Sequence, residues 1–228
     1  MTIPISRRPP MEDPLNLLAG ALAKLYSIWV SRTYPFASLG DKLSIQFSTS
    51  LSRSRAHRIS LGNSVDLRAY SWLNPAIEPS STGEPVIVIE DNCCIGFNSI
   101  ISARNHIHIE PDVLIAQSVL IQDHNHGYED PTLPISEQGI TEGGRIRIGH
   151  GTWIGHGAAI ICPRGQLTIG SNCVIGANAV VLRSIPPNSV VFGIPAKIIK
   201  QFDPVKKAWV LGSGSEREQI TRDASVVA

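Results

Sequence analysis

Aliphatic residues return at every sixth position through the central part of the chain. The series run through Ile89, Ile95, Ile101 and Ile107, then Ile109, Ile115 and Ile121, then Ile148, Ile154 and Ile160, then Ile169, Ile175 and Val181. A less regular part of the same repeat precedes these series, with aliphatic residues at Ile59, Val65 and Ile77. An amphipathic helix repeats about every 3.6 residues and a strand about every 2. The period therefore fits neither a helix nor a long strand.

Small and turn-forming residues fill the spaces between these aliphatic positions. Ile95 is followed by Gly96-Phe97-Asn98, and Ile175 is followed by Gly176-Ala177-Asn178. Glycine or asparagine after a short strand supplies the positive φ that a tight turn needs. The pattern predicts that three hexads close one triangular turn of a coil, with the aliphatic side chains inside. Successive turns then stack about 4.8 Å apart as parallel strands, and this stacking buries the apolar faces.

The repeat divides the chain into three parts and one insertion. We expect an N-terminal helix and irregular segment over residues 1–58, an all-β parallel coil over 59–200, and a short tail over 201–228. The hexads stop between residues 122 and 145, and a long irregular excursion from a compact repeat is usually functional or disordered. The coil and this loop are therefore the first places to look for a site.

The apolar run from Leu15 to Val30 is the longest in the chain. Polar residues interrupt it, and it falls short of the roughly 20 apolar residues that cross a bilayer. The run predicts a helix that packs on the body of the protein or on a neighbouring copy. Arginines on both sides leave a second interpretation, peripheral contact of residues 14–31 with a membrane surface.

Composition narrows the class of protein. The chain has 228 residues, of which 43% are apolar and 17% charged, and its net charge is +1. These values indicate a folded domain with extensions and give no sign of nucleic-acid binding. Residues 1–60 carry eight lysines and arginines against three acidic residues, so the N-terminal part is basic. The four cysteines lack CxxC spacing, and no signal peptide is recognisable at Met1, which predicts reduced thiols in a cytoplasmic protein.

Titratable side chains gather where the excursion begins. Residues 123–128 read Asp-His-Asn-His-Gly-Tyr, directly after the inward-facing Ile121. The stacked coil would hold the first residues of this segment, while the rest of the loop can fold over a neighbouring surface. An imidazole near neutral pKa is suited to general base catalysis. We therefore expect one fixed histidine under a movable loop.

The loop and its flanks resemble a known family. The stretch Val113–Ala116, the segment Asp123–Pro131, the segment Ile148–Gly155 and the ending Ile185–Lys197 resemble hexapeptide-repeat acyltransferases. Within these, the chain is most similar to sugar O-acetyltransferases of the maltose, galactoside, nodulation-factor and exopolysaccharide type. The resemblance implies a left-handed parallel β-helix, an acetyl-CoA co-substrate and a homotrimer with active sites between subunits. It also implies transfer of the acetyl group to a hydroxyl of a saccharide or other small acceptor.

The family's catalytic histidine aligns with His126, and His124 is the second candidate. The family has proline after this histidine, whereas this chain has Gly127. Asp123 or Glu129 is a candidate to orient the imidazole, with a solvated loop carboxylate as the plainer interpretation. The remaining assignments are substrate binding by Asp123, Asn105, Tyr128 and Trp153 and cofactor binding by Gly157, Ala158, Ala159, Ala177 and Lys197. For most of these the plainer alternatives are turn formation, packing or solvation.

Other functions share the same coil. His124, His126 and His150 are candidates for a zinc site like that of γ-class carbonic anhydrases, which take three histidines across a trimer interface. Otherwise no metal is expected. An inert hexapeptide scaffold is a third interpretation, because a fold does not by itself fix a function. Within the acetyltransferase class, an amine acceptor and a longer acyl donor also stay open.

Overall fold

The structure is a computed structural model that describes residues 14–78 and 82–211, with side chains from residue 20 onwards. It contains one long helix, α1 (Pro14–Thr33), and two short 3₁₀ helices, η1 (Arg53–Arg58) and η2 (Ile135–Glu137). The strands of the first six-stranded sheet are β1 (Ser38–Leu39), β4 (Ile59–Leu61), β7 (Ile87–Ile89), β10 (His106–Ile109), β13 (Arg145–Ile148) and β16 (Gln166–Ile169). The nine-stranded sheet contains β2 (Ser44–Ile45), β5 (Asp66–Leu67), β8 (Cys94–Ile95), β11 (Leu114–Ile115), β14 (Trp153–Ile154), β17 (Val174–Ile175), β19 (Ser189–Phe192), β20 (Lys197–Asp203) and β21 (Ala208–Leu211). The second six-stranded sheet contains β3 (Ser50–Leu51), β6 (Trp72–Pro75), β9 (Ile100–Ala103), β12 (Leu120–Gln122), β15 (Ala159–Ile161) and β18 (Val180–Val181).

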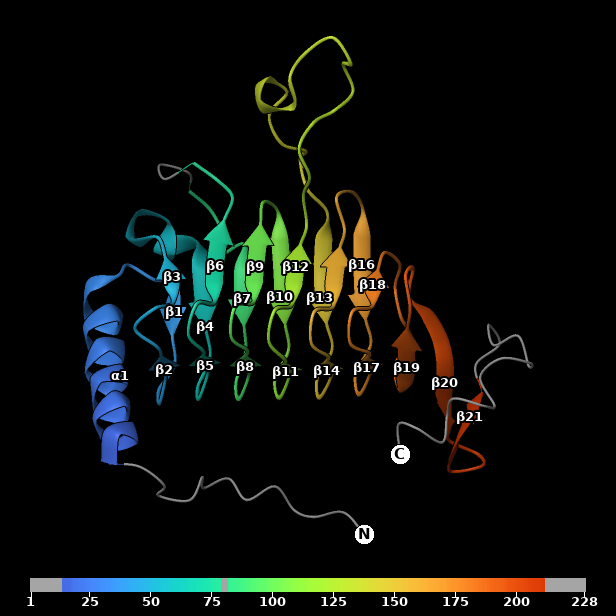
Figure 1. The fold of residues 1–228 in the computed structure, drawn as a ribbon, viewed down its shortest axis with the longest axis horizontal. Coiled ribbons are helices and arrows are strands. Elements are labelled where there is room, and N and C mark those ends of the chain that lie inside the picture. Colours follow the sequence, from blue (N-terminus) through green and yellow to red (C-terminus); the bar gives the residue numbers. More distant parts are fainter. Residues whose placement is uncertain (1–13, 79–81, 212–228) are drawn as a thin grey trace.

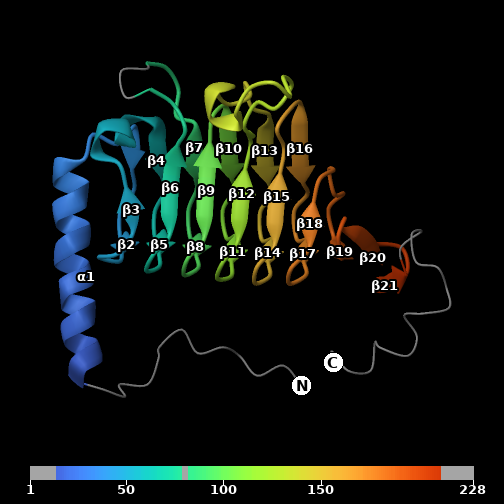
Figure 2. The same cartoon turned by 45° about the horizontal axis from the view of Figure 1, so that its top comes forward.

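The three sheets form the sides of one parallel coil (Figures 1 and 2). We call them sheet A, which contains β1, sheet B, which contains β2, and sheet C, which contains β3. From β1 to β18 the chain visits A, B and C in turn, and strands one turn apart pair in parallel. This confirms the predicted all-β fold and its triangular turns.

The predicted aliphatic positions form ladders inside the coil. Ile89, Ile109, Ile148 and Ile169 stand one above another in sheet A. The equivalent ladders begin at Ile95 in sheet B and at Ile101 in sheet C. Every member of the three ladders is at most 1% exposed. The apparent slip between Ile107 and Ile109 arises because both residues point inward from the four-residue strand β10.

Each corner of the coil has two positions with different requirements, one for a positive φ and one for a residue without a side chain. Asn98 and Gly157, each three residues after an inward isoleucine, carry the positive φ, at 55° and 68°. Gly96, directly after its isoleucine, is needed for a different reason. A Cβ there would lie 2.4 Å from the backbone of Ala116 in the next turn. The sequence interpretation assigned positive φ to either residue type, whereas the first glycine serves close stacking.

The coil begins earlier than expected from the sequence. β1, β2 and β3 form a complete turn over residues 38–51 and pair in parallel with β4, β5 and β6. Residues 1–58 are therefore not simply a helix and an irregular segment. At the other end, β19 still pairs in parallel with β17, but β20 and β21 add as an antiparallel hairpin. Of the expected tail, residues 212–228 lie outside the described part.

Helix α1 lies across the N-terminal end of the coil, beside β2 (Figures 1 and 2). Val30 is fully buried there, and the Ser27 hydroxyl accepts a hydrogen bond of 2.8 Å from the Ile45 N–H. Among the described residues, none of the helices is long and apolar enough to cross a membrane. The four cysteines are free, and three of them are buried.

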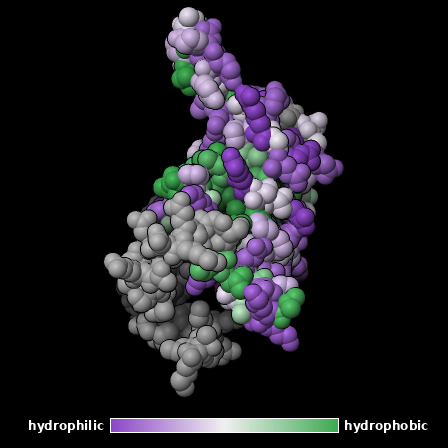
Figure 3. Space-filling view, turned by 90° about the vertical axis from the view of Figure 1, so that its right-hand side faces the viewer, coloured by the Kyte–Doolittle hydropathy of each residue, from purple (hydrophilic) through white to green (hydrophobic). Residues whose placement is uncertain are grey.

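The excursion leaves the coil after β12 in sheet C and returns at β13 in sheet A. It contains η2 and stands above the corner between these sheets (Figure 1). Figure 3, which faces the C-terminal end of the coil, shows it as a mostly hydrophilic projection. The fold thus places the whole histidine segment at one corner of the coil.

Candidate functional site

Asp123 is the buried anchor at the base of the excursion. Its side chain is fully buried, and its two carboxylate oxygens accept backbone N–H bonds of 2.7–2.9 Å from Arg104, Asn105 and His106. These three residues form the corner one turn earlier in the coil. The carboxylate therefore ties the start of the excursion to the preceding turn. The expectation that Asp123 contacts the substrate does not fit this burial.

The two candidate histidines differ sharply in environment. His124 is 8% exposed, and its Nδ1 lies 2.9 Å from Asp123 Oδ1. His126 is exposed, and its backbone forms an antiparallel bridge with Ile140 on the returning limb of the loop. The structure thus separates a held, buried imidazole from one that is open to a ligand.

Glu129 does not orient either histidine in the described structure. Its carboxylate accepts an N–H bond of 2.9 Å from Tyr128 and pairs with Arg164 at 3.0 Å. The Tyr128 N–H and its own N–H, followed by the Arg164 charge, lower the pKa of the Glu129 carboxyl. Tyr128 itself is 66% exposed in the loop. The orienting role is therefore left to Asp123, whose contact is with His124.

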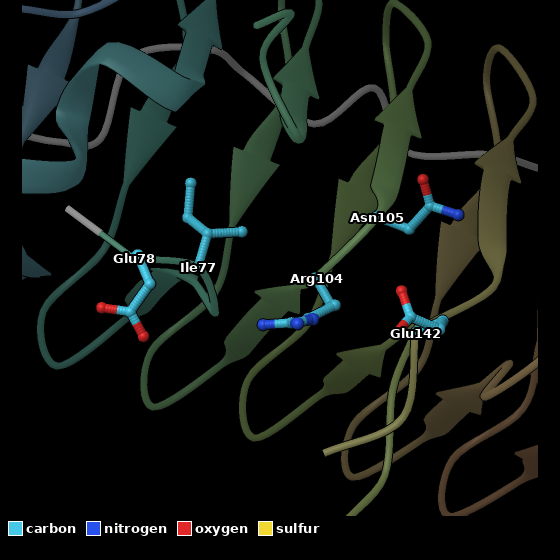
Figure 4. Close-up of a pocket in the computed structure, with 5 residues that line it drawn as sticks. All are labelled: Ile77, Glu78, Arg104, Asn105 and Glu142. Atoms are coloured by element: carbon cyan, nitrogen blue, oxygen red, sulfur yellow. The ribbon is translucent and has the colours of Figure 1, made fainter. Parts of the chain in front are cut away.

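A polar cavity of about 440 Å³ opens beside this corner. It is lined by Ile77, Glu78, Arg104, Asn105 and Glu142 (Figure 4). Arg104 lies between the Glu78 side and the Glu142 side of the cavity, and its Nη1 donates a hydrogen bond of 3.2 Å to the Ala76 carbonyl. The backbone N–H groups of Arg104 and Asn105 are the ones that Asp123 holds. The cavity and the histidine segment therefore share one buried carboxylate.

Sequence reasoning named Asn105 but missed Arg104, Glu78 and Glu142. A signal for Arg104 was present, because it precedes Asn105 in the same corner. Glu78 comes from the corner one turn before that of Arg104 and Asn105. Glu142 comes from the returning limb of the loop, which a period of six does not relate to the coil. His106, beside Asn105, is half-buried, and its burial lowers the pKa of the imidazole below the ordinary 6.5.

The other predicted ligand residues lie on different parts of the same chain. Trp153 points outward from β14 in sheet B and is 48% exposed. Gly157 and Ala177 are at the corners between sheets B and C, where Ala158 is fully buried and Ala159 begins β15. Lys197 is exposed at the start of β20. Within one chain these residues are therefore not gathered around His126, which belongs to the corner between sheets C and A.

The burial of Ala158 limits its expected role in cofactor binding. The whole residue is 0% exposed, and its N–H and carbonyl are bonded to Gly155 and Leu120, so no part of Ala158 is open to a ligand in one chain. The exposed Ala177 and the partly exposed Gly157 keep accessible surface. Within the described residues, no group of three or more histidine, cysteine or acidic side chains is placed to hold a metal ion. His150 lies instead beside Asp112, 3.4 Å from its carboxylate.

The fold and this loop define a three-sided β-helix with a histidine-bearing insertion at one corner. The family described as the hexapeptide repeat of succinyl-transferase matches residues 86–116 and 166–186. The chain is 37% identical over 133 residues to the putative lipopolysaccharide biosynthesis O-acetyl transferase WbbJ of Escherichia coli, covering 56% of this chain and 66% of that protein. It is 32% identical over 133 residues to the galactoside O-acetyltransferase of E. coli, covering 58% and 62%.

One more sequence relative and one solved structure are also similar to this chain. The probable acetyltransferase Rv3034c of Mycobacterium tuberculosis is 41% identical over 110 residues, covering 48% of this chain and 35% of that protein. The chain thus spans between about a third and two thirds of these three relatives. The N-acyltransferase AntD from Bacillus cereus superposes with a TM-score of 0.60 over 78% of this chain and 86% of that chain, at 19% identity.

These findings place the chain in a family. It belongs to the hexapeptide-repeat acyltransferases, as the loop and the hexads indicated, and its parallel coil matches the left-handed β-helix of that family.

Proposed function

We propose that this protein transfers the acetyl group of acetyl-CoA to a hydroxyl of a saccharide, with His126 as general base. The observation that carries the proposal is the exposed imidazole of His126 at the corner that also holds the polar cavity. The names of relatives such as WbbJ and the galactoside O-acetyltransferase support the same chemistry. The zinc hydratase and inert scaffold interpretations have no comparable support.

The reaction needs one proton carrier. Neutral His126 takes the proton of the acceptor hydroxyl while that oxygen attacks the thioester carbonyl carbon. The tetrahedral intermediate collapses, the carbon–sulfur bond breaks, and the imidazolium returns its proton to the leaving sulfur. The products are the acetyl ester and CoA.

His126 fits this role better than His124 because a base must reach the hydroxyl. His124 has little accessible surface, and its Nδ1 is engaged by Asp123. We assign His124 and Asp123 to positioning, since together they fix the chain two residues before the base. Access thus separates the base from the residues that hold it.

The cavity beside the corner is the proposed acceptor site. Its volume is within the range of about 300–1,000 Å³ that is usual for ligand pockets. The carboxylates of Glu78 and Glu142 accept hydrogen bonds from hydroxyls, and the guanidinium and amide of Arg104 and Asn105 donate to ring and hydroxyl oxygens. A lining of this kind suits a polyhydroxylated acceptor.

The donor site is proposed along the corners between sheets B and C of a neighbouring copy. The small or turn residues there, including Gly157 and Ala177, leave room for an extended pantetheine chain. AntD, whose fold is similar, is crystallised with dTDP and 3-hydroxybutyryl-CoA. Because Trp153 and these corners are remote from His126 within one chain, an intersubunit site would bring the two halves together.

Side-by-side assembly as a homotrimer fits the outer surfaces of the coil. Sheet A presents polar and charged residues outward, among them His108, Arg145 and Arg147. Sheets B and C carry more exposed apolar side chains, among them Trp72, Leu114 and Trp153. Contacts through sheets B and C would bury this apolar surface and leave the charged sheet in water.

Matched variants of the two histidines test the mechanism. His126→Ala should lower kcat for acetyl transfer by at least about 100-fold, the low end of the usual general base contribution, with little change in CoA affinity. His124→Gln, the control, should retain measurable turnover and show a loss of stability. Wild-type turnover in His126→Ala, together with loss of turnover in a folded His124→Gln, would transfer the role of base to His124.

A further inference from the structure

Helix α1 is apolar on two opposite faces. The inner face packs on the end of the coil through Tyr26, Ser27 and Val30. The outer face carries Leu22, Leu25, Ile28 and Trp29, which are between 49% and 64% exposed. A surface helix of a globular protein usually has a polar outer face. This outer face is therefore built to meet an apolar surface.

Aromatic residues extend the same surface beyond the helix. Phe47, in the corner after β2, is 79% exposed and lies edge-on to Tyr26, with ring centroids 5.5 Å apart. Tyr26 also stacks on Trp29, and Trp29 contacts Tyr34. Tryptophan and tyrosine are the residues that favour the boundary between bilayer and water. We call Leu22, Leu25, Ile28, Trp29 and Phe47 the end patch.

The position of the end patch keeps it free in a side-by-side assembly. Figures 1 and 2 show α1 across the end of the coil and not along one of its three sides. Copies that pack through the sides leave the ends uncovered. Such packing would also place the end patches of all copies on one surface if the coils run in the same direction.

The charge of helix α1 indicates what kind of surface the end patch meets. Helix α1 contains no acidic residue, and its charged side chains are Lys24 and Arg32. Residues 1–60 carry eight lysines and arginines against three acidic residues. Basic residues near a bilayer are attracted to anionic lipid head groups. An apolar face together with basic residues on the same helix is the combination that interfacial helices use.

We propose that the end patch binds the surface of an anionic phospholipid bilayer, with α1 lying in the plane of the interface. The helix does not span the bilayer, in agreement with its limited hydropathy. Leu22, Leu25 and Trp29 enter the boundary between head groups and acyl chains, and Lys24 and Arg32 lie at head-group level. The proposal stands on the helix and its position, and it holds or fails independently of the acetyl transfer reaction.

Flotation of the full chain with lipid vesicles tests the proposal. The protein should bind phosphatidylcholine vesicles that contain phosphatidylglycerol, and bind less to phosphatidylcholine alone or at raised salt. The variant Leu22→Gln/Leu25→Gln should lose about tenfold or more in partitioning, because two buried leucines are replaced. The control Val205→Gln/Leu211→Gln removes side chains that are 91% and 60% exposed at the other end of the protein, and it should bind like the wild type.

Three results would overturn the membrane proposal. One is absence of wild-type binding to anionic vesicles, and another is equal binding by the α1 variant. The third comes from sedimentation of the same two proteins without lipid. A smaller assembly in the α1 variant than in the wild type would mean that a second copy covers the end patch.

Discussion

Replacing Asp123 by asparagine tests whether this carboxylate holds the catalytic corner. The substitution keeps the size of the side chain and changes one oxygen to an NH₂ group. Asp123 Oδ2 accepts from two backbone N–H groups, and Oδ1 accepts from the Arg104 N–H. The asparagine side chain keeps the most hydrogen bonds when its oxygen takes the position of Oδ2. Even then the Arg104 N–H faces another donor and is left without an acceptor.

The Oδ1 contact with His124 Nδ1, at 2.9 Å, can still be made, because that nitrogen can accept from the new NH₂ group. The expected cost therefore follows from the lost Arg104 bond. An unsatisfied buried donor costs about 1–3 kcal/mol. For a chain of 150–250 residues, each kcal/mol corresponds to a shift of about 2–4 °C in Tm. Asp123→Asn should therefore lower Tm by roughly 2–12 °C. Asp123→Ala, which leaves three N–H groups without their acceptor, should lower it further.

Thermal unfolding at one fixed protein concentration measures the effect, and hydrogen exchange locates it. The amides of Arg104, Asn105 and His106 should exchange faster in Asp123→Asn than in the wild type. Asp130→Asn is the matched control, because the Asp130 carboxylate also accepts two hydrogen bonds, from Thr132, but lies in the exposed loop. An unchanged Tm together with unchanged exchange in Asp123→Asn would refute the anchoring role.

Three further substitutions or modifications probe the coil. Gly96→Ala places a Cβ 2.4 Å from the backbone of Ala116 and should lower the free energy of unfolding by about 1–3 kcal/mol or more, as measured by thermal unfolding. In the control Gly20→Ala, the new Cβ has nothing within 4 Å. This control should leave the stability unchanged or raise it by up to about 1 kcal/mol. Burial lowers the pKa of His106 in the folded protein below 6.5. As the pH falls below 6.5, the imidazole is therefore protonated more readily in the unfolded chain than in the folded one, and the folded state loses stability. Urea unfolding at neutral pH and at about pH 5.5 should show a smaller loss for His106→Gln than for the wild type. Burial raises the pKa of the Cys93 thiol to about 12, so alkylation near pH 8 should label Cys93 only after unfolding, as peptide mass mapping would show.

The repeat could be read from the sequence because each inward position has a single chemical requirement. Only aliphatic side chains fill the interior of a narrow coil, and the period follows directly from the three flat sides. The first turn was nevertheless missed. Leu39, Ile45 and Leu51 are spaced by six and are inward members of that turn. Leu39 and Leu51 are only partly buried. Two of the three positions carry leucine in place of the isoleucine and valine of the series that begins at Ile89, which made the six-residue repeat harder to recognise.

The site was predicted less completely than the coil because it depends on contacts between turns. The sequence indicated that Asp123 and the histidines lie together, but it did not show that the backbone of residues 104–106 would occupy the carboxylate. The sequence also assigned Trp153 to substrate binding, whereas Trp153 lies in sheet B. The excursion begins at a corner remote from sheet B, so proximity along the chain does not become proximity in space.

A structure of the assembled protein with coenzyme A bound would show whether His126 faces the acyl donor. We expect the thiol sulfur to lie in a crevice between two copies, facing the imidazole of His126 from one copy, with the corner around Gly157 of the other alongside the pantetheine chain. A sulfur bound elsewhere, with the His126 ring turned into solvent away from any crevice between copies, would contradict it.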